Sequence, residues 1–151
     1  AFIDVLKVVT AFTLAHSLTL TLASLSLIAL PSRFVESAIA ASVILAAVNN
    51  IYPLFRGRRP VAAFAFGLIH GFGFASVLID LGLPKTSLLA SLFGFNLGVE
   101  LGQLCIVALF LPLAFTLRNT MFYRRLLTGG SAAIALVAMV WLVERAFDMQ
   151  M

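Results

Sequence analysis

Long apolar runs separated by short polar or basic stretches dominate the sequence. About 20 apolar residues in a helix cross a hydrocarbon core about 30 Å thick, and each run is long enough to do so. The runs lack the apolar-polar alternation that is typical of half-buried strands. We therefore predict an all-α fold, a polytopic transmembrane bundle in one domain over residues 1–151. About five membrane-spanning helices are expected, near residues 5–30, 34–54, 61–81, 87–117 and 126–147.

The composition supports a membrane protein. Of the 151 residues, 62% are hydrophobic and only 11% are charged, whereas about a quarter of the residues are charged in soluble domains. The mean hydropathy is +1.12. We therefore expect the lipid bilayer to be the solvent of this chain. The single cysteine, Cys105, lies inside an apolar run and is expected to be a small buried hydrophobic residue.

Basic residues are unevenly distributed between the loops. The formal net charge is +4, but the basic residues lie in short segments between apolar runs, so we expect no nucleic-acid partner. Two arginine-rich loops, 56–59 and 118–125, alternate with loops that hold only Arg33 or Lys85. Because loops rich in lysine and arginine tend to stay in the cytoplasm, we predict that both arginine-rich loops face the cytoplasm.

Polar residues inside the apolar runs are costly, so their positions are informative. The first run carries His16 near its middle, beside a stripe of threonine and serine side chains at helical spacing. The third run carries His70, also near its middle, between Gly67, Gly71 and Gly73. The hydroxyl stripe is typical of helix packing, and the glycines allow close packing, access to His70, or both. The histidines, in contrast, need partners for both ring nitrogens.

The fourth run places two different faces on one helix. Asn96, Glu100 and Gln103 are spaced at i, i+4 and i+7 and share one face. On the roughly opposite face, glycine recurs at every fourth position from Gly94 to Gly102. One face can therefore press against a neighbouring helix while the other offers oxygen ligands. In the alternative interpretation, Glu100 is protonated and bonded to a carbonyl.

Two imidazoles and a carboxylate are common ligands of a divalent cation. His16, His70 and Glu100 lie at similar depths on three helices, so we predict that they bind a metal ion in the middle of the bilayer. Asn96 and Gln103 are expected to bind the same ion or to orient its ligands. Nitrogen and oxygen ligands without a thiolate suit nickel, cobalt or zinc.

Glu36 stands at the start of the second run, near the surface opposite to the arginine-rich loops. In one interpretation it is an interfacial carboxylate, stabilised by the positive end of its helix. In the other it belongs to the metal-binding set, at the point where a cation enters from outside.

Four stretches resemble the HupE/UreJ family of bacterial membrane proteins. They are TAFTLAHSLTL (10–20), Val35-Glu36 followed by 38–42, GLIHGFGFA (67–75) and FNLGVELGQ (95–103), and together they cover most of the chain in the family's order. The resemblance implies a nickel or cobalt permease of the inner membrane. It carries onto the six residues His16, Glu36, His70, Asn96, Glu100 and Gln103. The family's usual first helix, with a histidine- and aspartate-containing motif, has no counterpart here, so we expect the chain to lack that helix or to be truncated.

Three functions remain open from the sequence. The first is a divalent metal-ion permease, driven by a gradient or a partner because no GxxxxGK[ST] nucleotide-binding motif is present. The second is a structural subunit of a larger membrane complex, or a homo-oligomer, which the glycine repeat and short loops would suit. The third is an intramembrane metal-dependent hydrolase, since two histidines and a carboxylate also describe a catalytic zinc site. We favour the permease and expect no enzymatic activity.

Overall fold

The computed structural model describes residues 2–80 and 85–147, and this part of the chain is built from helices without strands. The helices are α1 (Phe2–Ser24), α2 (Ser32–Ile51), α3 (Arg59–Asp80), α4 (Lys85–Leu117) and α5 (Met121–Phe147). The predicted all-α fold is therefore confirmed.

Four of the helices, α1, α2, α4 and α5, are long and apolar enough to cross a membrane. Within the described residues, α3 contributes a shorter apolar stretch, Arg59–Ala75. Large hydrophobic side chains cover the outside of the bundle, for example Phe93 (72% exposed) and Leu109 (73% exposed). Such a surface is stable against hydrocarbon and unfavourable against water. The molecule is a polytopic membrane protein.

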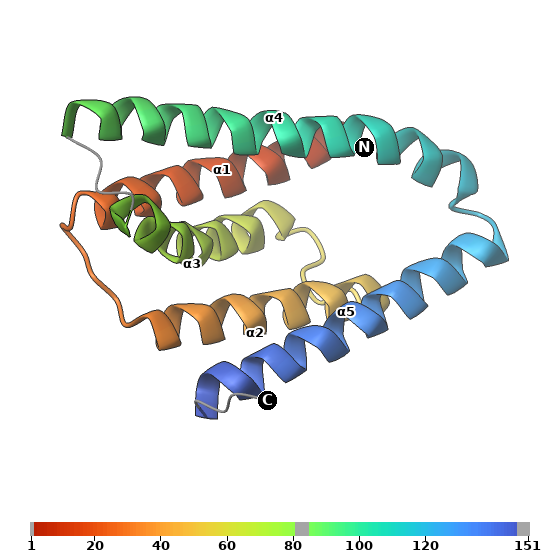
Figure 1. Ribbon diagram of the computed structural model, residues 1–151. Coiled ribbons are helices and arrows are strands. Elements are labelled where there is room, and N and C mark those ends of the chain that lie inside the picture. The colour runs from red at the N-terminus through yellow and green to blue at the C-terminus, as the bar shows by residue number, and fades with distance from the viewer. Residues whose placement is uncertain (1, 81–84, 148–151) are drawn as a thin grey trace.

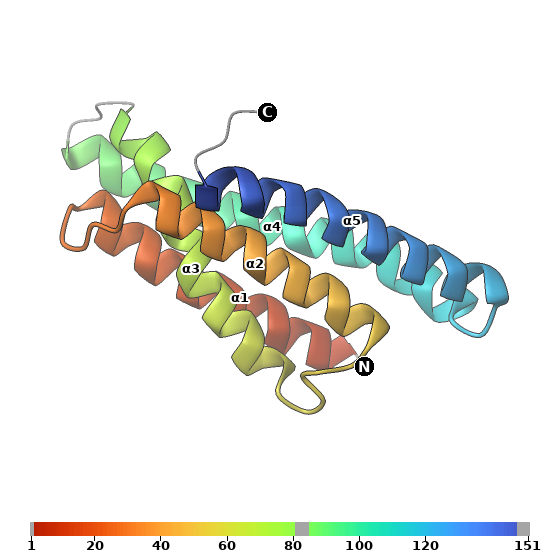
Figure 2. The same cartoon turned by 90° about the horizontal axis from the view of Figure 1, so that it is seen from below.

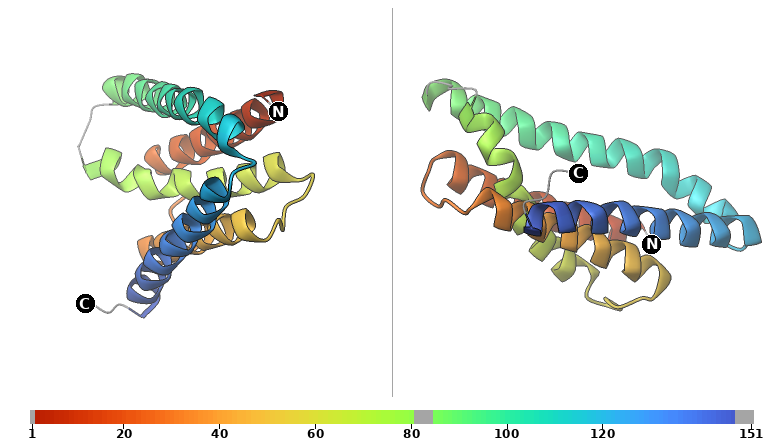
Figure 3. Two further views of the ribbon diagram at one scale, coloured as in Figure 1. Left: turned by 90° about the vertical axis from the view of Figure 1, so that its right-hand side faces the viewer. Right: turned by 60° about the horizontal axis from the view of Figure 1, so that its bottom comes forward.

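The helices lie in a row, in the order α4, α1, α3, α2, α5 (Figures 1 and 3). The most extensive contacts join α1 to α3 and α2 to α5, while α4 packs mainly on α1 and only slightly on α5. Along the helix axes, one end of the bundle holds the N-terminus, the α2–α3 loop and the α4–α5 loop (Figures 1 and 2). The opposite end holds the α1–α2 loop and the C-terminal end of α5. Both arginine-rich segments are therefore at the same end.

Glycines bring the backbones of α1 and α3 unusually close. A Cβ atom added at Gly71 would clash with Oγ1 of Thr19 and the carbonyl oxygen of His16, and would lie 2.8 Å from the backbone nitrogen of Leu20. Gly67 meets the carbonyl oxygen of Phe12 in the same way. The close-packing interpretation of these two glycines is therefore confirmed.

The first helix is shorter than the predicted 5–30, because a C-terminal cap stops it at Ser24. The backbone N–H of Leu27 donates to the carbonyl of Leu22 (2.9 Å), and that of Ser26 donates to Ala23 (2.9 Å). Ser26 itself has a positive φ of 56°. These features define a Schellman motif, which is usually built on glycine. The serine hides this cap from a sequence-based prediction.

Local capping also explains the shifts at α2 and α5. The second helix ends at Ile51, three residues early, because Tyr52 adopts the extended conformation that precedes a proline, here Pro53. The fifth helix begins at Met121 instead of 126, because Oγ1 of Thr120 accepts the backbone N–H of Tyr123 (3.2 Å) as an N-cap. Two arginines of the predicted loop 118–125, Arg124 and Arg125, therefore lie inside α5.

The fourth helix continues through Pro112 and ends at Leu117, the end that was predicted for it. Leu88 and Leu92 of this helix join Leu20 in the buried core. The expectation for Cys105 was wrong: this side chain is exposed on α4. Because α4 packs mainly on α1, most of its surface is left uncovered.

Candidate metal site

His16 is almost completely buried, with 2% of its surface exposed. Its ring is stacked between Phe12 (centroids 5.9 Å apart) and Phe95 (6.1 Å), with interplanar angles of 17° on both sides. The ring of Phe74 meets it edge-on at 6.0 Å. Helices α1, α3 and α4 each contribute to this aromatic shell, so His16 marks the point where these three helices meet.

A hydrogen-bonded chain fixes which nitrogen of His16 carries the proton. The side-chain amide of Asn96 donates through Nδ2 to the carbonyl of Leu92 (2.9 Å), so its Oδ1 is the acceptor. Nδ1 of His16 lies 3.3 Å from this oxygen and is therefore the donor. The lone pair of the neutral ring is then on Nε2, the arrangement of a histidine prepared to bind a metal ion.

His70 has the same arrangement on α3. Its Nδ1 donates to the carbonyl of Phe66, one turn earlier (2.8 Å), which again leaves the lone pair on Nε2. The side chain is half-buried. It meets the ring of Phe12 edge-on at 5.5 Å. Phe12 therefore contacts both imidazoles.

A groove with a largely apolar lining lies between α1 and α4, with a volume of about 410 Å³. Thr13, Ser17 and Thr21 line its α1 side, and Asn96 and Glu100 line its α4 side. One turn beyond Glu100 on α4, Oε1 of the predicted ligand Gln103 accepts a hydrogen bond from a threonine hydroxyl of α1 (3.2 Å). The shared face predicted for the polar residues of α4 therefore points at α1.

The structure does not assemble the predicted ligands as one shell. His16 contacts Asn96, but no three His, Cys, Asp or Glu side chains among residues 2–80 and 85–147 form a group that could hold a metal ion. The expected convergence of His16, His70 and Glu100 is not seen in this conformation, within the described part of the chain. Glu100 lies in the groove between α4 and α1, whereas His70 lies on α3, where its Nδ1 bonds to the carbonyl of Phe66. That these residues bind metal stays a prediction.

Glu36 is placed apart from the histidines, in an ion pair. Its Oε2 lies 2.6 Å from Nε of Arg145, on the last turn of α5. Arg33, in the first turn of α2, donates to the carbonyls of Arg145 (3.1 Å) and Ala146. Cationic groups at the C-terminal end of a helix are favourable, so these contacts fasten the start of α2 to the end of α5.

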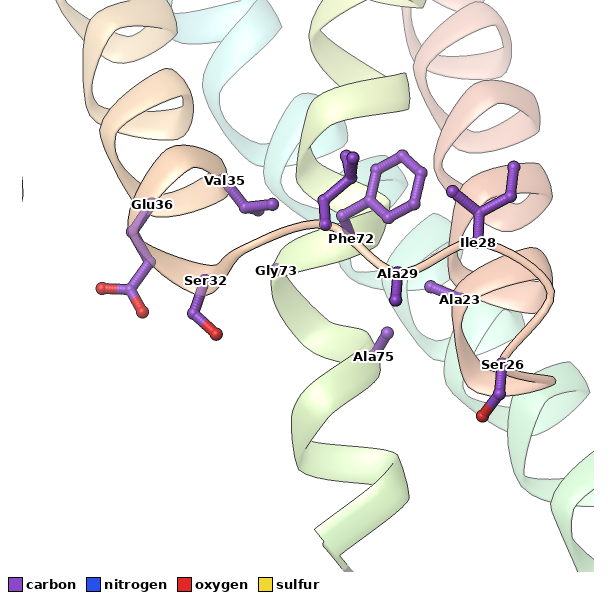
Figure 4. Close-up of a pocket in the computed structure, with 11 residues that line it drawn as sticks. Ala23, Ser26, Ile28, Ala29, Ser32, Val35, Glu36, Phe72, Gly73 and Ala75 are labelled. Atoms are coloured by element: carbon purple, nitrogen blue, oxygen red, sulfur yellow. The ribbon is translucent and has the colours of Figure 1, made fainter.

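A hollow of about 160 Å³ lies beside this ion pair. Figure 4 shows Glu36 and Ser32 on one side of it and Ala23 and Ser26 on the other, with α3 passing between them. Gly73 of α3 lines the hollow, and His70 lies three residues before it, on nearly the same face of the helix. The hollow therefore lies one helical turn from the second imidazole.

Sequence reasoning missed two features of this region. The first is the aromatic shell of His16. Its phenylalanines stand at fixed offsets from the polar residues: Phe12 is four residues before His16, Phe74 is four residues after His70, and Phe95 directly precedes Asn96. This spacing was the available signal for the shell. The roles of Arg33 and Arg145 had no local signal, because the two residues are far apart in the sequence.

Comparison with known proteins gives one result. A family model described as HupE / UreJ protein matches residues 1–145, nearly the whole chain. No curated protein and no solved structure matches the chain.

Proposed function

The chain belongs to the HupE/UreJ family, and on this basis we propose that it is a permease for a divalent transition-metal ion, nickel or cobalt. Members of the family are associated with nickel, and sometimes cobalt, uptake. The membrane is the bacterial inner membrane, with the arginine-rich end of the bundle in the cytoplasm. The position of both arginine-rich segments at one end supports this orientation (Figure 1).

The observation that carries the proposal is the common arrangement of the two histidines. In each, Nδ1 donates to a carbonyl-type oxygen, on Asn96 for His16 and on Phe66 for His70. Oxygen acceptors of this kind fix the tautomer of metal-binding histidines and orient the ring. Neutral imidazole nitrogen is a good ligand for nickel, cobalt and zinc.

The arrangement suggests a route along the bundle. A cation enters at the hollow beside Glu36, where Arg145 must give way, and reaches His70 one turn deeper. The cation then moves from His70 to His16, and from His16 into the groove at Glu100. Asn96 and Gln103 supply amide oxygens there. Two successive histidines, instead of one closed shell, suit transport, because an ion that is bound too tightly is not released.

The aromatic shell is the barrier on this route. With 2% exposure, His16 is inaccessible in this conformation. On this proposal, transport requires Phe12, Phe74 or Phe95 to move.

The test is nickel uptake into proteoliposomes that contain an internal metal-sensitive dye. We expect His16→Gln and His70→Gln, which preserve most of the side-chain volume, to reduce uptake strongly. Asn50→Ala is the control, because this asparagine is also a helix amide that bonds to a neighbouring helix, through Ser131 (3.2 Å). Unchanged uptake in both histidine variants would remove the proposal.

One observation favours the second candidate, a subunit of a larger membrane assembly. A Cβ atom added at Gly94, Gly98 or Gly102 would meet nothing within 4 Å in the part of the chain that the structure describes. This flat face of α4 is suited to another transmembrane helix. If assembly is the function, Gly98→Leu will release a co-purifying subunit while metal uptake by the purified chain stays absent.

A further inference from the structure

A second hollow, of about 570 Å³, lies at the arginine-rich end of the bundle, away from the histidines. Its lining comes from four places: the first turns of α1, the α2–α3 loop, the start of α3 and the end of α4. Positive charge comes from Lys7 of α1, Arg59 at the start of α3 and Arg118 directly after α4. The basic groups therefore converge on one hollow, although the sequence scatters them over the whole chain.

The charge of this lining is unbalanced. Three cations face a single carboxylate, Asp4, which leaves an excess of two positive charges. Asp4 is itself engaged in an interaction and is not a free competitor for a ligand. The positive end of the α3 dipole lies at Arg59, where the helix begins, and adds to the same field. The hollow is therefore suited to an anion.

The guanidinium of Arg118 is held in place at this site. It lies 4.0 Å from the ring centroid of Phe115, a cation-π contact, and both residues line the hollow. Val8 and Leu111 extend the apolar part of the wall. A wholly soluble anion would have no use for these side chains, whereas a molecule with a charged head and a hydrocarbon tail would contact both parts.

We propose that this hollow binds an anionic phospholipid, with its phosphate among Lys7, Arg59 and Arg118 and its acyl chains along Val8 and Leu111. Basic pockets between transmembrane helices at the cytoplasmic surface are suited to acidic headgroups. The site is independent of the proposed transport function, since none of the six predicted metal-binding residues lines it.

The test uses the purified full chain in detergent, titrated with dioleoyl-phosphatidylglycerol or dioleoyl-phosphatidylcholine. Bound lipid is counted by native mass spectrometry. We expect retained phosphatidylglycerol and little phosphatidylcholine. Each lining cation near the surface is expected to contribute roughly fivefold to the affinity, so Lys7→Gln/Arg59→Gln/Arg118→Gln should lose most of the bound phosphatidylglycerol.

A matched variant distinguishes lipid binding at the hollow from nonspecific attraction to the basic end of the bundle. Arg56→Gln/Arg58→Gln/Arg124→Gln removes the same charge from the same end of the bundle, but none of these residues lines the hollow. This variant should keep its lipid, and equal loss in both triple variants would overturn the proposal. If the triple variant of the lining residues does not fold, the single variant Arg118→Gln replaces it. Retention of phosphatidylglycerol at the wild-type level in this single variant would count against the site.

Glycerol phosphate distinguishes the source of the phosphate. If it displaces phosphatidylglycerol at equal concentration, the acyl chains contribute nothing and the lipid assignment is wrong. If phosphatidylglycerol stays bound, the apolar wall contributes as proposed.

Discussion

Glu36 and Arg145, which are far apart in the sequence, form an ion pair in which Nε and Oε2 are 2.6 Å apart. The glutamate is the less exposed partner, with 31% of its side chain accessible against 54% for the arginine. Arg33 strengthens the same junction through the carbonyls at the end of α5. The pair therefore closes the α2–α5 half of the bundle at the end opposite to the arginine-rich loops.

We predict that Arg145→Gln lowers the free energy of unfolding by about 1 kcal/mol, the upper range for a partly exposed ion pair. The measurement is thermal unfolding in detergent. Glu144→Gln is the control, since it changes one charge in the same turn of α5. In Glu36→Gln/Arg145→Gln the losses should be less than additive, and full additivity would show that the two residues do not interact.

The glycines of α3 and α4 should respond in opposite ways to the same substitution. Gly71→Ala would press a methyl group against backbone atoms of α1, and should destabilise the protein by about 1–3 kcal/mol. Gly98→Ala adds a methyl group in open space, and should be neutral or stabilising by up to about 1 kcal/mol. Thermal unfolding of both variants checks this, and equal effects would contradict the packing described here.

Asn96 should control the metal affinity of His16. Asn96→Leu removes the acceptor of Nδ1–H, so the imidazole is free to change tautomer or rotate. Loss of such an oriented hydrogen bond typically lowers metal affinity roughly 10–100-fold. Nickel binding measured by calorimetry should show this decrease, and nitrogen chemical shifts of His16 should show a changed tautomer.

The control for Asn96 is Asn50→Ala, which alters an amide on α2 that bonds to Ser131 of α5. Its metal affinity should equal that of the wild type. An unchanged affinity in Asn96→Leu would contradict this role of Asn96.

Cys105 offers a direct test of the membrane-facing surface. The side chain is exposed on α4, within a helix long and apolar enough to span the bilayer. In liposomes it should react with a small lipid-soluble maleimide and resist a charged, membrane-impermeant one. Rapid reaction with the charged reagent would show that this face of α4 meets water.

The helices and the polar positions were predictable because both follow from hydrophobic periodicity and length. The convergence of His16, His70 and Glu100 was not predictable in the same way. A similar depth along each helix does not show which faces of the helices meet: here Glu100 lines the groove between α4 and α1, and His70 bonds within α3. A row of helices and a ring of helices have the same hydropathy profile.

Helix ends were the second source of error, for a local reason. Ser26 adopts a positive φ, which is uncommon for a residue with a side chain. The apolar run through residue 30 therefore continued past the true end of α1. Thr120 shows the opposite case, because a threonine N-cap is a recognisable start signal.

The two contacts that α3 makes differ in stiffness. Towards α1 its glycines lie directly on backbone atoms, which cannot yield without unwinding a helix. Towards α2 the closest neighbour of Gly73 is Cδ1 of Ile39, the end of a rotatable side chain. Any large displacement between helices should therefore occur at the boundary between α3 and α2, with α1 and α3 moving together and α2 moving with α5. The hollow beside Glu36 lies on that boundary, so its size would report the displacement directly.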